Sequence, residues 1–124
     1  MKYFTHTEFD SPDVPGSGSN MDSDFLDMLD DARACSGIPY RITSGFRTRA
    51  YNESLIQRAY SASHNSSHLK GLAADIAAVN SEARMRIVGG LLAAGFTRIG
   101  IGKTFVHVDS DQDKREGVMW VYDG

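Results

Sequence analysis

The stretch SSHLKGLAAD, residues 66–75, limits most strongly what this chain can fold into. His68 and Asp75 stand on either side of Gly71, and Asp75 lies inside the otherwise apolar run LAADIAAV, residues 72–79. A carboxylate among apolar residues is costly unless it is paired, hydrogen-bonded or bound to a cation. The fold must therefore bring a partner to Asp75 from elsewhere in the chain.

Patterns of apolar residues predict alternating helices and strands, followed by a run of strands. The alanines of 72–79 would also suit a helix, but the short apolar run favours a strand. This order indicates an α+β fold in which helices pack against a small, mostly antiparallel sheet. The expected helices cover 22–35, 47–60 and 81–94, and the expected strands cover 39–46, 72–79, a hairpin within 97–110 that turns near Gly102 and Lys103, and 117–124.

The size and composition of the chain fit a single domain over residues 1–124. With 124 residues and 41% hydrophobic content, the chain can bury one modest core. Residues 1–20 are expected to form an N-terminal arm and loop, because Pro, Gly and Ser concentrate in 11–20. Cys35 is the only cysteine, which excludes an intrachain disulfide and leaves it as a small core or surface residue.

Charge and N-terminal sequence exclude several classes of partner. The formal net charge of −3 lacks the basic excess typical of nucleic-acid binders, and no stretch reaches transmembrane length. We therefore expect no nucleic-acid partner and no membrane partner. A monomer is the expected state, although the sequence does not settle the oligomeric state. The start MKYFTHTEFDSPD has no apolar signal region, so we expect synthesis in the cytoplasm without a signal peptide.

The segment FVHVD, residues 105–109, has the alternation of a strand. Side chains along a strand point alternately to opposite faces, so His107 and Asp109 share one face while Val106 and Val108 share the other. A histidine in an apolar strand is more often a hydrogen-bonded core residue than a ligand. His107 and Asp109 can nevertheless contribute to one site.

Three of these polar residues together resemble a metal-ligand set. Taken alone, His68 and Asp75 could be a polar loop followed by a carboxylate that caps backbone N–H groups. A catalytic zinc ion, however, takes three protein ligands from His and Asp/Glu and leaves a fourth position for water. His68, Asp75 and His107 are such a set, and zinc would neutralise Asp75.

The segments around these residues resemble the zinc D-alanyl-D-alanine carboxypeptidase family, which includes phage endolysin peptidases and shares its fold with the Hedgehog signalling domain. SSHLKGLAADI is similar to the family signature Ser-x-His-x-x-Gly-x-Ala-x-Asp, and FVHVD is similar to its downstream histidine strand. ITSGFRT, residues 42–48, with Asn52 after it, resembles the family's Ser-Gly-Tyr-Arg segment. FDSPDVPGSG resembles the N-terminal arm of the small, phage-associated branch. The resemblance runs from about Phe9 to Tyr122.

The resemblance implies roles for individual residues. It implies that His68, Asp75 and His107 bind zinc and that Arg47 is the cation near the scissile carbonyl. A guanidinium and a metal ion can together stabilise the oxyanion formed by attack on an amide. Arg47 could instead be a structural ion-pair partner, and Arg49, expected on a solvated helix face, could exchange roles with it.

The chain departs from the better-known family members at the general base. Those members place a glutamate or aspartate three residues before the last histidine ligand, where this chain has Thr104. Threonine cannot take a proton from water at a metal. Asp109 is the best remaining candidate for the base, and orienting the His107 ligand is an equally good reading of it.

Other polar and aromatic residues have weaker signals. Some could add hydrogen bonds near the metal or could be ordinary loop residues: Ser44, Ser67 and His64. His6 has no partner spacing and is expected at the surface. Trp120 and Tyr122 alternate on the last strand and are expected to pack on the sheet, although an aromatic at a cleft rim could contact a peptide.

The sequence therefore predicts a zinc metallopeptidase that hydrolyses peptide bonds involving D-amino acids in bacterial peptidoglycan stem peptides. Either a D,D-carboxypeptidase or an endopeptidase of phage lysis or wall remodelling would fit, acting on the cell wall after release or as part of a virion. The alternative is a non-catalytic, zinc-containing binding or virion module of the same fold, which the threonine at position 104 permits.

Overall fold

The chain adopts the predicted α+β fold, with helices packed against a mostly antiparallel sheet. The computed structural model describes residues 1–60 and 62–123. Ser61, between the expected helix 47–60 and the expected strand 72–79, and Gly124 of the expected last strand lie outside the described residues. In chain order the elements are the 3₁₀ turns η1 (His6–Phe9) and η2 (Ser17–Asn20), α1 (Ser23–Ser36), β1 (Ile42–Ser44), α2 (Arg49–Gln57), the 3₁₀ turn η3 (Ser67–Lys70), β2 (Ala73–Ala77), α3 (Ser81–Ala93), β3 (Arg98–Ile101), β4 (Phe105–Asp109) and β5 (Val118–Val121).

The strands form one sheet in the order β1-β2-β4-β3-β5. Neighbouring strands are antiparallel except for β5, which runs parallel to β3. The expected hairpin is β3 and β4. Residues 110–117 carry the chain from β4 past β3 to its other edge, so β5 points the same way as β3.

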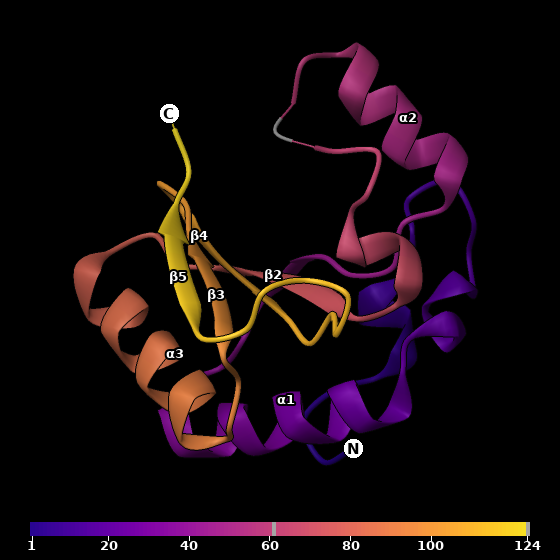
Figure 1. Ribbon diagram of the computed structural model, residues 1–124. Coiled ribbons are helices and arrows are strands. Elements are labelled where there is room, and N and C mark those ends of the chain that lie inside the picture. The colour runs from indigo at the N-terminus through magenta and orange to yellow at the C-terminus, as the bar shows by residue number, and fades with distance from the viewer. Residues whose placement is uncertain (61, 124) are drawn as a thin grey trace.

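Helices α1 and α3 cover one face of the sheet, whereas α2 stands away from both (Figure 1). Helix α1 begins where Asp22 accepts a hydrogen bond from the backbone N–H of Phe25, and ends at Gly37, whose φ of 71° suits glycine. Its apolar side packs into the core through Phe25, Leu26 and Leu29, each no more than 2% exposed. This core fixes the side of the sheet that remains for chemistry.

The alternation of β2 and β4 separates the core from the opposite face. Ala74 and Ile76 of β2, like Val106 and Val108 of β4, are fully buried among the core residues. Asp75 lies between Ala74 and Ile76 and therefore points away from the core. The apolar appearance of 72–79 thus comes from one face of the strand, and the carboxylate belongs to the other.

The N-terminal arm packs into the fold more closely than a linker would. Phe9 is fully buried, and its carbonyl accepts a hydrogen bond from Phe46 N–H at 2.9 Å. A Cβ at Gly45 would lie only 2.6 Å from the Phe9 Cα, so glycine is required where the arm crosses. This crossing explains why the expected strand 39–46 ends at Ser44; in the structure it begins at Ile42.

Tyr40 gives the core a measurable dependence on alkaline pH. Burial raises the pKa of Tyr40 to about 12, although a hydrogen bond with Ser36 opposes the shift. The unfolded chain loses this phenolic proton near pH 10 and the folded chain only near pH 12, so stability is complete below pH 10 and falls between these values. Tyr40→Phe is expected to remove this loss, which comes to about 2 kcal/mol between pH 9 and pH 11.5 and which denaturant titrations at these two pH values would measure. An unchanged pH dependence in the variant would contradict the prediction.

The remaining surface features agree with the sequence predictions. His6 and Cys35 are both exposed. Within the described ranges, no helix has the length and apolar character needed to cross a membrane.

Candidate functional site

Pairing of β2 with β4 brings two of the predicted ligands together. Asp75 is the direct cross-strand partner of His107. Their side chains meet on the open face, with His107 Nδ1 2.9 Å from Asp75 Oδ1. His68 enters from η3, and its Nε2 lies 3.4 Å from the same carboxylate oxygen. One donor atom from each of His68, Asp75 and His107 lies within 4.8 Å of the other two.

The turn η3 presents His68 with one ring nitrogen already occupied. Ser66 caps the turn by accepting a hydrogen bond from His68 N–H, and Gly71, with a φ of 70°, ends it. His68 Nδ1 lies 2.7 Å from the carbonyl oxygen of Gly45. A carbonyl only accepts, so Nδ1 carries the proton and Nε2 presents its lone pair towards Asp75. Such an arrangement is typical of a histidine ligand whose far nitrogen is fixed by the protein.

His107 is fixed in the same manner by Asp109. The Asp109 Oδ2 lies 2.8 Å from His107 Nε2, on the side of the ring opposite the nitrogen that faces Asp75. The other oxygen, Asp109 Oδ1, accepts hydrogen bonds from Arg98 Nε at 2.6 Å and Asp111 N–H at 3.2 Å. Both oxygens of Asp109 are therefore engaged, and the geometry favours an orienting contact on His107 over a base aimed at the substrate.

The electrostatics of the cluster keep its carboxylates ionised. Burial raises the pKa of Asp75, but the imidazoles of His68 and His107 outweigh burial and hold it well below its usual range. Burial is also the largest influence on Asp109, yet hydrogen bonds from His107 and Arg98 lower its pKa to about 2.

The two histidines respond in opposite directions. Burial lowers the pKa of His68 more than Asp75 raises it, which favours the neutral ring. Burial also lowers the pKa of His107, but hydrogen bonds to Asp109 and Asp75 outweigh it and raise the pKa above its ordinary value. A metal ion would therefore compete with a proton more strongly for His107 than for His68.

The donor set fits a zinc ion. Four ligands arranged tetrahedrally around zinc lie about 3.4 Å from one another. The corresponding separations from Asp75 Oδ1 are 3.4 Å to His68 Nε2 and 2.9 Å to His107 Nδ1. Two imidazole nitrogens and one carboxylate oxygen are also the ligand types of catalytic zinc sites that keep one position open.

Arg47 lies at the edge of this cluster. Its guanidinium is 3.6 Å from Asp75 Oδ2, and its side chain is only 10% exposed. Ser44 Oγ accepts from Arg47 Nε at 3.1 Å, and Asn52 Oδ1 accepts from Nη1 at 3.3 Å. Arg47 N–H also donates to the carbonyl of His68, which links the arginine to the ligand turn.

A cavity of about 330 Å³ opens over the cluster, with aromatic side chains on one wall. The Trp120 ring lies 5.6 Å from that of His107 between centroids, and the Tyr122 ring lies 6.4 Å away. A Cβ at Gly100 would approach ring atoms of both Trp120 and Tyr122 to 2.7 Å. Glycine in β3 therefore allows Trp120 of β5, and Tyr122 just after β5, to border the site, which is the second of the two placements considered from the sequence.

Sequence reasoning missed Arg98 and Asp111. Arg98 follows the strand alternation that also places Gly100 on the open face, and this spacing could have indicated it. Asp111 is 1% exposed and joins β4 to η3 by accepting from Ser67 Oγ at 2.8 Å and Lys70 Nζ at 2.9 Å. The Asp111 contacts join segments far apart in the chain, so no local sequence pattern predicts them.

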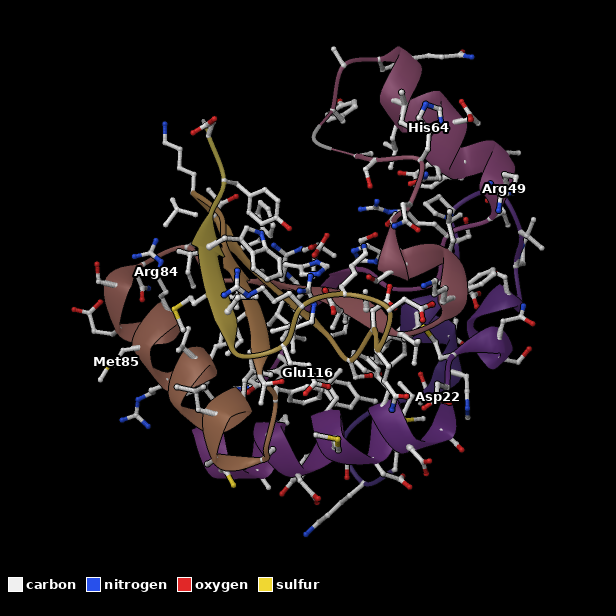
Figure 2. All side chains as sticks on the ribbon, viewed as in Figure 1. Asp22, Arg49, His64, Arg84, Met85 and Glu116 are labelled. Atoms are coloured by element: carbon white, nitrogen blue, oxygen red, sulfur yellow. The ribbon has the colours of Figure 1, made fainter. Side chains whose placement is uncertain are left out.

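The weaker candidates separate clearly in the structure. Ser44 supports Arg47, whereas Ser67 binds Asp111. His64 is 73% exposed beside α2, with Nδ1 3.1 Å from Glu53 Oε1 (Figure 2). Arg49 is exposed on α2, as expected from the sequence.

Comparison with known proteins identifies the family of this chain. The family model for Peptidase M15 matches residues 3–109, which include every residue of the candidate metal site. The structure resembles that of the L-Ala D-Glu endopeptidase ChiX of Serratia marcescens, with a TM-score of 0.63 and 18% sequence identity over 75% of this chain and 82% of that chain. No curated protein sequence matches the chain. Because the family match spans most of its length, this chain belongs to the M15 family of zinc peptidases.

Proposed function

We propose that this chain is a zinc-dependent peptidase that cleaves peptide bonds involving D-amino acids in bacterial peptidoglycan stem peptides. The observation that carries the proposal is the convergence of His68, Asp75 and His107, with the far nitrogen of each histidine held by another protein group. The structural resemblance to a protein named as an L-Ala D-Glu endopeptidase supports a peptidoglycan substrate. Such an enzyme would act on the cell wall in phage lysis or wall remodelling.

The chain's own residues divide the work of the reaction. His68, Asp75 and His107 would hold the zinc ion, which supplies a Lewis acid for the scissile carbonyl and lowers the pKa of water. Arg47 would donate hydrogen bonds to the carbonyl oxygen as negative charge develops on it. Ser44 and Asn52 hold the guanidinium in place, so little reorientation is needed during the reaction.

Asp109 would position His107 and so act through a metal ligand. Among the described residues that line the cavity, Asp75 and Asp109 are the only carboxylates, and Asp75 belongs to the ligand set. Because Arg98 and His107 already engage Asp109, the carboxylate is suited to hold His107 with Nδ1 towards Asp75.

Asp109→Asn distinguishes positioning from base catalysis. If Asp109 positions His107, the substitution is expected to weaken zinc affinity about 10–100-fold, with activity recovering in excess zinc. If Asp109 were the general base, zinc content would survive and turnover would fall about 10²–10⁴-fold at every zinc concentration. Activity measured along a zinc titration separates the two results. Asp113→Asn is the control, because its side chain is 83% exposed.

A zinc-containing binding module without activity is the second candidate. Thr104 stands where the better-known members of the resembled family carry an acid, and both oxygens of Asp109 are already engaged by Arg98 and His107. Such a module would retain the metal and bind peptide without cleaving it.

The test is incubation of zinc-loaded protein with purified muropeptides, followed by mass spectrometry of the products. We expect new fragments that end or begin at a D-amino acid, and no fragments after chelation. Zinc-loaded protein that binds muropeptides but leaves them intact would support the second candidate.

A further inference from the structure

A second cavity adjoins the one over the candidate metal site. It measures about 750 Å³ and lies between α2, the β1–β2 edge and the β3–β4 turn. Arg47, Ala62, Asp75 and Phe105 line both cavities. A peptide bound at the metal site can therefore continue into this space.

The second cavity is strongly cationic. Three guanidinium groups line it, those of Arg41, Arg47 and Arg58, and the only acid among its described lining residues is Asp75. Asp75 is already engaged by Arg47 and the two histidines of the metal site. The carboxylate of Asp75 therefore belongs to the metal site and does not neutralise Arg41 or Arg58.

Arg41 and Arg58 have no acidic partner in the part of the chain that the structure describes. No ion pair within residues 1–60 and 62–123 includes either guanidinium. Arg58 instead donates to the carbonyl and hydroxyl of Ser54 and lies 5.4 Å from the Tyr60 ring centroid. Both arginines are exposed and so are accessible to a ligand.

The cavity over the metal site differs in this respect. Its additional cations both have acidic partners: Arg98 pairs with Asp109, and Lys114 Nζ lies 3.8 Å from Asp111 Oδ2. Uncompensated positive charge is therefore concentrated on the α2 side of the metal site. A ligand that crosses both cavities would meet this charge on one side only.

We propose that the cavity lined by Arg41 and Arg58 is a subsite for a carboxylate-bearing segment of the substrate peptide. Guanidinium groups bind carboxylates with two parallel hydrogen bonds, which gives orientation as well as affinity. Tyr51 and Leu55 of α2 line the same cavity and can contact the apolar parts of such a peptide. The enzyme accordingly prefers acidic peptides, with the carboxylate on the α2 side of the cleaved bond. This inference rests on the proposed peptidase function for the identity of its ligand.

The test compares a D-amino-acid peptide that carries a free D-glutamate carboxylate with the same peptide in which that group is a primary amide. Arg41→Gln and Arg58→Gln are each expected to raise KM for the acidic peptide about two- to fivefold, with kcat unchanged, and to leave KM for the amide peptide unaltered. High salt should diminish the wild-type preference, because these charges are exposed. Arg49→Gln is the control, since Arg49 begins α2, which ends just before Arg58, but Arg49 lines neither cavity.

Calorimetric binding of both peptides keeps this result separate from the proposed function. If the wild-type chain binds the acidic peptide through Arg41 and Arg58 but cleaves neither peptide, the subsite stands and the peptidase proposal fails. If both peptides are cleaved and bound equally well, the subsite is overturned while the peptidase proposal stands. An equal rise in KM for the acidic peptide in Arg49→Gln and Arg58→Gln would likewise overturn the subsite.

Discussion

Replacing His68 with alanine is expected to remove zinc and peptidase activity together. His68 is 3% exposed and contributes one of three protein donors, so its loss leaves only Asp75 and His107 and no adequate binding site. Activity should fall at least about 10³-fold, because without the metal no Lewis acid polarises the scissile carbonyl. Metal content by mass spectrometry and turnover of muropeptides measure the two effects on the same sample.

His64→Ala is the matched control for this change. His64 lies in the same loop region but is 73% exposed and does not line the cavity over the metal site. This variant should keep full zinc content and activity. If His68→Ala retained zinc at full occupancy, the ligand assignment would be wrong.

Replacing Arg47 with glutamine is expected to lower kcat about 10²–10³-fold while zinc remains bound. The reason is that Arg47 would contact the carbonyl oxygen mainly when negative charge develops there. Glutamine keeps some hydrogen-bonding capacity towards Ser44 and Asn52 but has no charge. Steady-state kinetics, zinc content and melting temperature should be measured for the same preparation.

The melting temperature separates catalysis from structure at this position. Arg47 also holds Asp75 at 3.6 Å, so a purely structural role would appear as lost zinc and lower stability, with kcat restored by excess zinc. Arg49→Gln should match the wild type in all three measurements, because that arginine is exposed on α2. A zinc-loaded Arg47→Gln protein with unchanged kcat would exclude the proposed role.

Strand alternation is why much of the site could be predicted from the sequence. In FVHVD the period of two placed His107 and Asp109 on one face, and the structure places both there with Val106 and Val108 in the core. The same rule explains Asp75, although only the pairing of β2 with β4 shows that His107 is its direct partner. The local sequence pattern thus predicts the sheet face on which a side chain lies. The pairing of strands determines which other side chains it contacts.

Contacts between distant segments could not be predicted in this way. The path of the chain between β4 and β5 makes β5 parallel to β3, and this placement brings Trp120 to the cavity wall. The second partner of Asp109 is Arg98 on the neighbouring strand of the β3–β4 hairpin, and only the register of that hairpin shows that the two side chains meet. The sequence left the role of Asp109 open because that role depends on which nitrogen of His107 it faces.

The central claim is that zinc held by His68, Asp75 and His107 enables this chain to hydrolyse peptidoglycan stem peptides. The measurement that tests it most directly is muropeptide hydrolysis by the chelated protein as zinc is added back in known amounts. We expect no hydrolysis without metal, and a rise that reaches its plateau at about one zinc ion per chain. Hydrolysis at the full rate by the metal-free chain would contradict the claim.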